Sequence, residues 1–460
     1  MKSILTSIFK TVYNHIKIMK GKYIMQSTLK QKLQQKTATL GVIGLGYVGL
    51  PLAVEKAKAG FKILGFDIQS EKVAMVNRGE NYIGDVVNED LAELVASGNL
   101  VATTEYSQAA SCDCVCIAVP TPLDIYQQPD ISHVKASTEG LVPYMHKDML
   151  VVLESTTYPG TTEELLKPIL EKSGLKCGED FYLAFSPERV DPGNLIYKTK
   201  NTPKVVGGIT QKCTDIAATM YEMILSAPVH RVSSPAVAEM EKILENTYRN
   251  VNIGLVNELA MLCNKMGISI WEVIDAAKTK PYGFQAFYPG PGLGGHCIPL
   301  DPYYLSWKAR EYGFHTSMIE ASMMVNDGMP EYVLGRAMKI LNRQKKAMNG
   351  AKILVLGVAY KQDIDDYRES PAIRVIEHLL KEGADVSYFD PWVEKFKEGD
   401  LVMHSIKELT DTVLKNADLV VITTAHTNID YDFVQKYASF IFDTKNAMKE
   451  ITNRDNIEVL

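Results

Sequence analysis

The sequence predicts an α/β protein with two Rossmann-like, doubly wound domains joined by a long central helix and a helical middle domain. Three observations lead to this fold class. Short apolar runs of strand length alternate with helical stretches in two separate parts of the chain. A glycine-rich turn follows the first of those runs. An unusually long helical pattern lies between the two parts.

Length and composition are those of a multidomain globular protein. The chain has 460 residues, of which 46% are hydrophobic and 23% charged, enough for two or three domains with separate cores. The formal net charge of −6 argues against a general nucleic-acid-binding surface. Seven cysteines without paired spacing indicate a reducing compartment, so we expect a cytoplasmic protein. Cys112, Cys114 and Cys116 alternate within an apolar run, which predicts small buried side chains on one face of a strand rather than a metal site.

The first 38 residues differ from the rest of the chain, because they carry eight lysines and no acidic residue. No run reaches the ~18 apolar residues of a membrane span, and no small-residue cleavage site follows a hydrophobic core. A basic amphipathic helix could lie on an anionic membrane surface. Alternatively, translation starts at Met19 or Met25 and the upstream residues are not native. We favour this second interpretation and expect residues 1–38 to form an extension outside the fold.

A dinucleotide-binding turn opens the first predicted domain, residues 39–230. Residues 40–43 form an expected strand, residues 50–59 a helix, and residues 61–66 a second strand that ends at Asp67. The turn between the first strand and the helix consists of Gly44, Leu45, Gly46, Tyr47, Val48 and Gly49. Its glycines permit close approach of a pyrophosphate to the helix N-terminus. Asp67 is placed to accept hydrogen bonds from the adenosine ribose and to repel a 2′-phosphate, so NAD is favoured over NADP. The alternative is a Rossmann-like fold with an empty site.

Polar residues follow the next strands of the same domain. These strands are expected over residues 114–119, 150–154 and 182–186. Thr121, Thr156 and Glu188 come shortly after their ends. Ligands bind beyond the carboxyl ends of strands in an open parallel sheet, so the three residues are candidates for one site. Each could equally be a turn residue or a helix cap.

A long helix is predicted from Pro235 to Met266, within a helical middle domain spanning residues 234–342. Lys242 and Asn246 lie four positions apart and therefore share a face. They are either a solvated surface pair or an oxyanion site. We expect a buried core stripe from Val237, Met240, Leu244, Val251, Leu255, Leu259 and Leu262. A helix of this length suits a connection between domains and a homo-oligomer interface.

A glycine-proline loop at residues 289–301 carries Cys297, with Asp301 four residues further on. Its composition excludes a regular helix or strand and allows a ligand to approach the backbone. A surface loop with an incidental thiol is the alternative.

A second Rossmann-like domain is expected over residues 350–460. Strands are predicted at residues 351–357, 385–389, 419–423 and 440–442, with a helix at residues 371–381. The turn at residues 357–361 lacks the dinucleotide glycine pattern. Its loop carries charged residues that suit a different phosphate ligand or, alternatively, a charged surface: Lys361, Asp363, Asp365, Asp366, Arg368 and Glu369.

Taken together, these stretches resemble the UDP-glucose/GDP-mannose dehydrogenase family from about Leu40 to the C-terminus. The matching motifs are GLGYVGLPLA, Glu154-Ser155-Thr156, Ser186-Pro187-Glu188, Lys242 with Asn246, GGHCIPLD, and Tyr360-Lys361 through Arg368-Glu369-Ser370. KTKPYGFQAFYPGPGLGGHCIP and ESTTYPGTTEELL are most similar to bacterial members acting on UDP-N-acetylglucosamine. UDP-glucose members carry a second acidic residue after Ser-Pro-Glu, where this chain has Arg189-Val190-Asp191-Pro192-Gly193. Their arginine upstream of the glycine loop has no clear counterpart at residues 280–283.

The resemblance implies a four-electron, NAD-dependent oxidation of the C6 alcohol of a UDP-sugar to a carboxylate, for surface polysaccharide synthesis. It implies catalytic roles for Cys297, Lys242, Asn246, Asp301, Glu188 and Thr156. It implies contacts with NAD from Gly44, Gly46, Tyr47, Val48, Gly49, Asp67, Lys72, Thr121, Thr156 and Arg368. It implies contacts with the nucleotide sugar from Glu188, Lys242, Asn246, Tyr288, Gly292, Gly294 and Lys361. A positive charge at Lys242 is expected to activate the thiol.

Three other functions remain open from the sequence. A two-electron hydroxyacid dehydrogenase needs no cysteine. A related enzyme could act on UDP-glucose, UDP-N-acetylmannosamine or GDP-mannose. A non-catalytic nucleotide sensor would not require Cys297, Lys242 and Asn246 together.

Overall fold

The computed structural model describes residues 28–84, 86–191, 194, 196–295 and 297–460. Residues 1–27, most of the expected N-terminal extension, lie outside the described residues. The rest of that extension is folded, contrary to our expectation. Helix α2 (Leu29–Gln34) buries Leu29 and Leu33, one turn apart, in the core of the first domain. Lys32 pairs with Asp113 at 2.6 Å.

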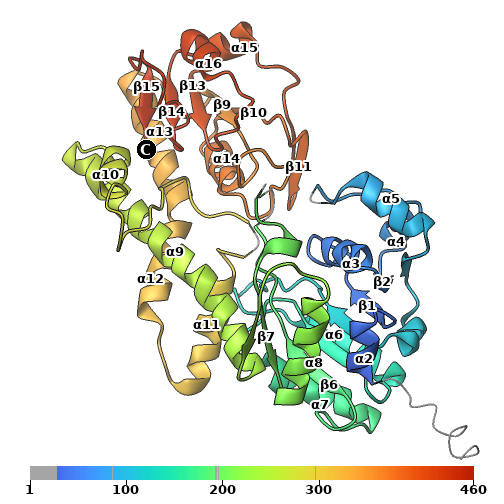
Figure 1. The fold of residues 1–460 in the computed structure, drawn as a ribbon. Helices are drawn as coiled ribbons and strands as arrows, with labels where there is room; N and C mark the ends of the chain where they lie inside the picture. The colour runs from blue at the N-terminus through green and yellow to red at the C-terminus, as the bar shows by residue number, and fades with distance from the viewer. Residues whose placement is uncertain (1–27, 85, 192–193, 195, 296) are drawn as a thin grey trace, which may run out of the picture.

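An eight-stranded sheet organises the first domain (Figure 1). Its strands are β1 (Thr39–Ile43), β2 (Lys62–Phe66), β3 (Leu100–Thr103), β4 (Cys114–Ile117), β5 (Leu150–Leu153), β6 (Tyr182–Phe185), β7 (Lys204–Gly208) and β8 (Val229–Val232). The order β3-β2-β1-β4-β5-β6-β7-β8 reverses direction between β1 and β4. All neighbours are parallel except β6 and β7. The crevice for a ligand therefore lies beyond the carboxyl ends of β1 and β4.

Helices cover both faces of this sheet. They are α3 (Gly49–Lys58), α4 (Ser70–Asn77), α5 (Asn88–Ala96), α6 (Ser132–Leu141), α7 (Lys167–Leu170) and α8 (Gln211–Glu222). Cys112, Cys114 and Cys116 are all fully buried, as predicted. The prediction that all three share one face is wrong. Cys112 precedes β4 and packs in the core on one side of the sheet, whereas Cys114 and Cys116 pack in the core on the other side.

The long helix α9 (Pro235–Met266) leads from the first sheet toward the second (Figure 1). The Ser234 side chain caps its start by accepting a hydrogen bond from the backbone N–H of Val237, at 3.3 Å. Gly267, with φ 71°, ends it. Helices α10 (Ile270–Ala277), α11 (Asp301–Ala309), α12 (Ser317–Asp327) and α13 (Met329–Arg343) follow.

The prediction that the apolar stripe of α9 is buried is wrong. Six of its members are exposed by 36–59%: Val237, Met240, Leu244, Leu255, Leu259 and Leu262. The buried face instead carries small and polar residues, including Gly254, Asn250 and Asn257. Gly254 lies against Ser322 of α12, where an added Cβ would come within 3.0 Å. Close packing of two helices selects small residues for the inner face, which leaves the large apolar side chains outside.

A second sheet of five parallel strands lies in the C-terminal part (Figure 1). Its order is β10 (Asp385–Phe389), β9 (Lys352–Leu356), β13 (Leu419–Ile422), β14 (Ile441–Asp443) and β15 (Ile457–Val459). Helices α14 (Pro371–Lys381), α15 (Asp411–Asn416) and α16 (Tyr431–Tyr437) accompany it, with a hairpin of β11 (Lys395–Glu398) and β12 (Leu401–His404). The predicted α/β fold class is confirmed.

Among the residues that the structure describes, no helix is both long and apolar enough to cross a bilayer.

Candidate active site

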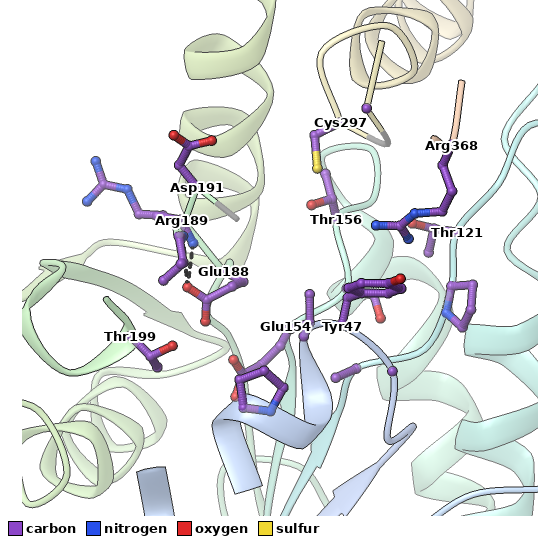
Figure 2. A pocket seen from close by; sticks show the side chains of 18 of the residues that line it. Tyr47, Thr121, Glu154, Thr156, Glu188, Arg189, Asp191, Thr199, Cys297 and Arg368 are labelled. Carbon is purple, nitrogen blue, oxygen red and sulfur yellow. Dashed lines mark hydrogen bonds between the residues drawn. The ribbon is translucent and has the colours of Figure 1, made fainter. Parts of the chain in front are cut away.

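One cavity of about 1650 Å³ lies between the two sheets. Figure 2 shows some of the side chains that line it. The loops that follow β1, β4, β5 and β6 form one wall, and the loop after β9 forms another. Helix α9 and the Cys297 loop close the space between them. Nearly all predicted site residues border this cavity: Gly44, Gly46, Tyr47, Val48, Asp67, Lys72, Thr121, Thr156, Glu188, Lys242, Asn246, Tyr288, Gly292, Gly294, Cys297, Lys361 and Arg368. Gly49 and Asp301 are the two that lie behind the cavity wall.

The glycine turn after β1 has the shape that a pyrophosphate needs. Gly44 has φ 90°, and a Cβ there would lie 2.4 Å from the carbonyl oxygen of Ala118. A Cβ on Gly49 would lie 1.7 Å from the carbonyl oxygen of Gly44, so this glycine permits helix and strand to approach. Gly46 has no atom within 4 Å of an added Cβ and faces open space. These three positions fit a dinucleotide whose phosphates lie against the turn.

Asp67 stands at the end of β2, partly exposed to the cavity. Its carboxylate accepts hydrogen bonds from the backbone N–H groups of Leu45, at 3.0 Å, and Gln69, at 2.9 Å. Lys72 borders the same region, with its Nζ 5.9 Å from the centre of the Tyr82 ring. This end of the cavity therefore has the acidic group that suits a ribose.

Arg368 reaches this turn from the second domain. Its guanidinium carbon lies 4.1 Å from the centre of the Tyr47 ring, and Asp366 holds it through hydrogen bonds of 2.7–3.1 Å. The side chains of Tyr47 and Arg368 are drawn together in Figure 2. Both domains thus contribute to one end of the cavity.

Ser155 links the loops that carry Thr121 and Thr156. Its hydroxyl accepts a hydrogen bond from the backbone N–H of Val119, at 2.9 Å, and donates to the carbonyl of Val119, at 2.7 Å. The Tyr304 hydroxyl donates to the carbonyl of Thr121, at 2.8 Å. These contacts fix both threonines at the carboxyl edge of the sheet.

Lys242 and Asn246 point into the cavity from α9 and are 7% and 5% exposed. The sequence left open whether they are a solvated pair, and their burial excludes that alternative. The Asn246 amide donates a hydrogen bond to Asp301 Oδ2, at 2.5 Å. Asp301 is itself buried at the start of α11. An amide and an ammonium group therefore converge where an oxyanion could be stabilised.

Cys297 borders the cavity and is half-buried. Burial raises the pKa of the thiol, and the negative charge of Asp301 adds to this effect. Lys242 and two arginines lower it, but by less. Lys242 thus favours the thiolate, as expected, but desolvation exceeds the attraction of the lysine and leaves the pKa of the thiol above its ordinary value. Burial also raises the pKa of the Asp301 carboxyl to about 6, against the opposing effects of Lys242 and Asn246.

The glycines of the Cys297 loop serve a purpose that the sequence did not indicate. An added Cβ on Gly294 would lie 2.6 Å from Cβ of Tyr360, and one on Gly292 would lie 2.9 Å from Cβ of Pro371. The backbone N–H of Gly295 donates to the carbonyl of Arg368, at 3.2 Å. The glycines therefore allow this loop to pack on the second domain while it borders the cavity.

The loop after β6 carries charged contacts to two other parts of the chain. Arg189 pairs with Glu241 and Glu245 of α9. Asp191 pairs with Lys361 of the second domain at 2.8 Å. Pro192 and Gly193, which complete the predicted departure from UDP-glucose members, lie outside the described residues.

Sequence reasoning missed Lys445, which follows β14 and borders the cavity. Burial lowers the pKa of this amine, although Asp443 opposes the effect. Its Nζ lies 2.9 Å from the position of an added Cβ on Gly290. The available signal was its place just after a strand of the second sheet, where ligands bind in an open parallel sheet. In the part of the chain that the structure describes, no group of three or more histidine, cysteine or carboxylate side chains could hold a metal ion.

The dinucleotide turn, the buried lysine-asparagine pair and the cysteine meet in one interdomain cavity, and this arrangement suits a dehydrogenase that uses a dinucleotide. Comparison with known proteins agrees with this class. Residues 38–225, 236–328 and 354–450 match the NAD binding, central and UDP binding domains of the UDP-glucose/GDP-mannose dehydrogenase family. The chain belongs to that family, and its cofactor is NAD.

Several relatives cover most of the chain. A UDP-N-acetyl-D-glucosamine 6-dehydrogenase of Pseudomonas aeruginosa is 39% identical over 78% of this chain and 84% of its own. A UDP-N-acetyl-D-mannosamine dehydrogenase of Pyrococcus horikoshii is 32% identical over 89% of this chain and 96% of its own. The solved structure of a UDP-D-ManNAc dehydrogenase from Pyrococcus horikoshii superposes with a TM-score of 0.83, at 32% identity, over 92% of this chain and 98% of that one.

Proposed function

We propose that the protein oxidises C6 of UDP-N-acetylglucosamine to the carboxylate, with two NAD reduced per sugar. The observation that carries the four-electron chemistry is the convergence of Cys297, Lys242 and Asn246 on the cavity that holds the glycine turn. The choice of sugar is supported by two relatives, 39% and 37% identical, that carry that name. UDP-N-acetylmannosamine is the second candidate, because relatives at 31–33% identity are named for it.

In the first half of the reaction the C6 alcohol becomes an aldehyde. Bound NAD supplies the hydride acceptor, once for each oxidation. Lys242 and the Asn246 amide stabilise the alkoxide from which the hydride leaves. The hydroxyl proton passes to a carboxylate of the site, and either Glu188 or Asp301 could accept it.

Cys297 makes the second oxidation possible, since an aldehyde has no hydride to give until a nucleophile adds. A bond forms between the sulfur and C6, and the thiol proton leaves to a base. Removal of hydride from this thiohemiacetal gives a thioester. Water held by Thr156 attacks the thioester, Glu188 takes its proton, and the carboxylate and the free thiol result.

A panel of nucleotide sugars assayed for NADH tests this proposal. We expect UDP-N-acetylglucosamine to give the highest kcat/KM and two NADH per sugar. Cys297→Ala is expected to prevent formation of the carboxylate. One NADH per sugar, or full turnover by the alanine variant, would contradict the thioester mechanism. A preference for UDP-N-acetylmannosamine would change the proposed sugar and leave the proposed mechanism unaffected.

We also propose that α9 packs against a second copy of the chain. The six exposed apolar side chains on its outer face support this, because such a contiguous stripe on a long helix is typical of a contact surface.

A further inference from the structure

A cluster of buried ionisable side chains lies at the wall of the cavity, which two of its members, Glu154 and Glu188, border. We call it the buried ion cluster. It consists of Lys56, Cys116, Glu154, Glu188, Lys204 and Tyr221. These residues come from α3, β4, the ends of β5 and β6, β7 and α8. Its two lysines and two glutamates balance in charge.

Lys204 joins the two carboxylates of this cluster. Its Nζ donates to Glu154 Oε2 at 2.9 Å and to Glu188 Oε2 at 3.1 Å. The side chain is only 5% exposed and does not border the cavity. The negative charges of the two glutamates outweigh burial and raise the pKa of the lysine, so it remains a cation. Lys204 therefore acts from behind Glu188 and cannot itself touch a substrate.

Glu154 anchors this lysine from below. Its side chain is completely buried, and the Tyr221 hydroxyl donates to Oε1 at 2.6 Å. Lys56 lies 3.6 Å from the same oxygen and 2.7 Å from the Cys116 sulfur. Burial opposes ionisation of Glu154, but Lys204 and Lys56 exceed this effect and lower the pKa of the carboxyl to about 2. Glu154 is therefore an anion at neutral pH.

Glu188 is held at both oxygens. Oε2 accepts from Lys204, and Oε1 accepts from the backbone N–H groups of Arg189, at 2.8 Å, and Val190, at 3.0 Å. Figure 2 shows these backbone contacts on the wall below Asp191. The side chain is 15% exposed, through the cavity. Three donors fix its rotamer without excluding it from the ligand space.

We propose that Lys204 is a positioning residue, which fixes the Glu188 carboxylate toward the substrate by a buried bridge to Glu154. This inference rests on the proposed role of Glu188 in proton transfer. Charge-assisted hydrogen bonds of this kind are short and strong in a buried setting. A carboxylate that must meet a water held by Thr156 gains from such fixation, since a displacement of about 1 Å can reduce the rate ~100-fold.

Other charged groups near Glu188 are already engaged. Arg189 pairs with Glu241 and Glu245, and Asp191 pairs with Lys361. Lys242 faces the cavity from α9. Lys204 is thus the ammonium group bonded to Glu188 among the described residues.

The test compares Lys204→Met with Lys204→Arg, each in the wild-type and in the Glu188→Gln background. For Lys204→Met we expect kcat with UDP-N-acetylglucosamine to fall about 10- to 100-fold. We expect KM to change by less than about threefold, since a residue outside the cavity contributes little to binding. Lys204→Arg keeps the charge and is expected to recover most of kcat. In the Glu188→Gln background, Lys204→Met is expected to cause no further loss.

Several outcomes would overturn the proposal. Unchanged kcat in folded Lys204→Met does so directly. A loss that is the same in both backgrounds means that the lysine does not act through Glu188. Full activity of Glu188→Gln would remove both the role of Glu188 and that of Lys204. By contrast, one NADH per sugar in the wild-type protein refutes the proposed function alone.

Folding of the variants is monitored by thermal unfolding. If Lys204→Met does not fold, the double variant Lys204→Met/Glu154→Gln replaces it, because it keeps the net charge of the buried ion cluster at zero, with Lys56 and Glu188 left as its charged members. The same fall in kcat is expected. A folded double variant with wild-type kcat contradicts the inference equally well.

Discussion

The ionisation of Cys297 depends on that of Asp301. Burial raises the pKa of both groups, and the charge of Asp301 further disfavours the thiolate. A neutral thiol is a weak nucleophile, so the proposed addition of Cys297 to the aldehyde requires a base. With a pKa of about 6, Asp301 is ionised near neutral pH yet remains able to accept a proton. Its hydrogen bond from Asn246 connects it to the cavity.

The raised pKa of Asp301 predicts a pH-dependent effect of Asp301→Asn on stability. Between the ordinary value of 3.8 and about 6, the folded protein binds more protons at this site than the unfolded chain. Wild-type stability must therefore fall relative to the variant as pH rises through this window. Between pH 4 and pH 8 we expect the free energy of unfolding of Asp301→Asn to rise by roughly 2–3 kcal/mol relative to that of the wild type.

Urea unfolding of both proteins at several pH values measures this shift. Asp275→Asn is the control, because the Asp275 carboxylate is 53% exposed and pairs with Lys278 at the surface. A difference between wild type and Asp301→Asn that is constant with pH would contradict the assignment.

The two faces of helix α9 carry different kinds of side chain. The inner face carries Lys242, Asn246 and the small residues that pack on α12. The outer face carries the apolar stripe. A contact between two copies along α9 would therefore be connected to Lys242 and Asn246 by a single rigid element.

Leu255→Glu tests the contact between copies. Leu255 is 54% exposed near the middle of the stripe, so a charge there would be buried without a partner in a dimer. We expect the molar mass of the variant, measured by light scattering, to fall toward the mass of one chain. Asn264→Glu is the matched control, since it adds the same charge nine residues further on, on the opposite side of the helix. A wild-type mass of one chain would contradict the proposed dimer.

The two sheets meet through the Cys297 loop and the segment 360–371. Gly294 contacts this segment, Arg368 lies over Tyr47, and Lys361 pairs with Asp191. The position of the thiol relative to the glycine turn therefore depends on how the two sheets are docked.

Gly294→Ala tests this dependence. Its Cβ would lie 2.6 Å from Tyr360 Cβ and 3.1 Å from the carbonyl of Glu369. We expect a loss of about 1–3 kcal/mol in stability, as for overpacking in a core, together with a lower kcat/KM. Gly335→Ala in α13 is the control, because no atom lies within 4 Å of an added Cβ. It is expected to keep activity and gain up to about 1 kcal/mol. Equal stability and equal kcat/KM of the two variants would contradict the packing role of Gly294.

Local patterns in the sequence were sufficient for most elements. Helix α9 begins at Pro235 and ends at Met266 as predicted, since a serine cap and a terminal glycine mark both ends. The strand at residues 440–442 is displaced by one residue, to Ile441–Asp443. The α9 stripe was assigned to the wrong side, because periodicity shows that a helix has an apolar face without showing what covers it.

The sequence by itself determined the fold class and the NAD turn, because turns, caps and strand ends are encoded locally. Its resemblance to a known family indicated most of the other residues that gather at the cavity. Only the tertiary structure decided the pKa values of the site residues and the contacts that hold them in position. The net rise in the pKa of Cys297, the packing role of Gly294 and the bridge from Lys204 to Glu188 each depend on residues distant in the chain. Desolvation and close contact arise only when those segments are brought together, so no local pattern could contain them.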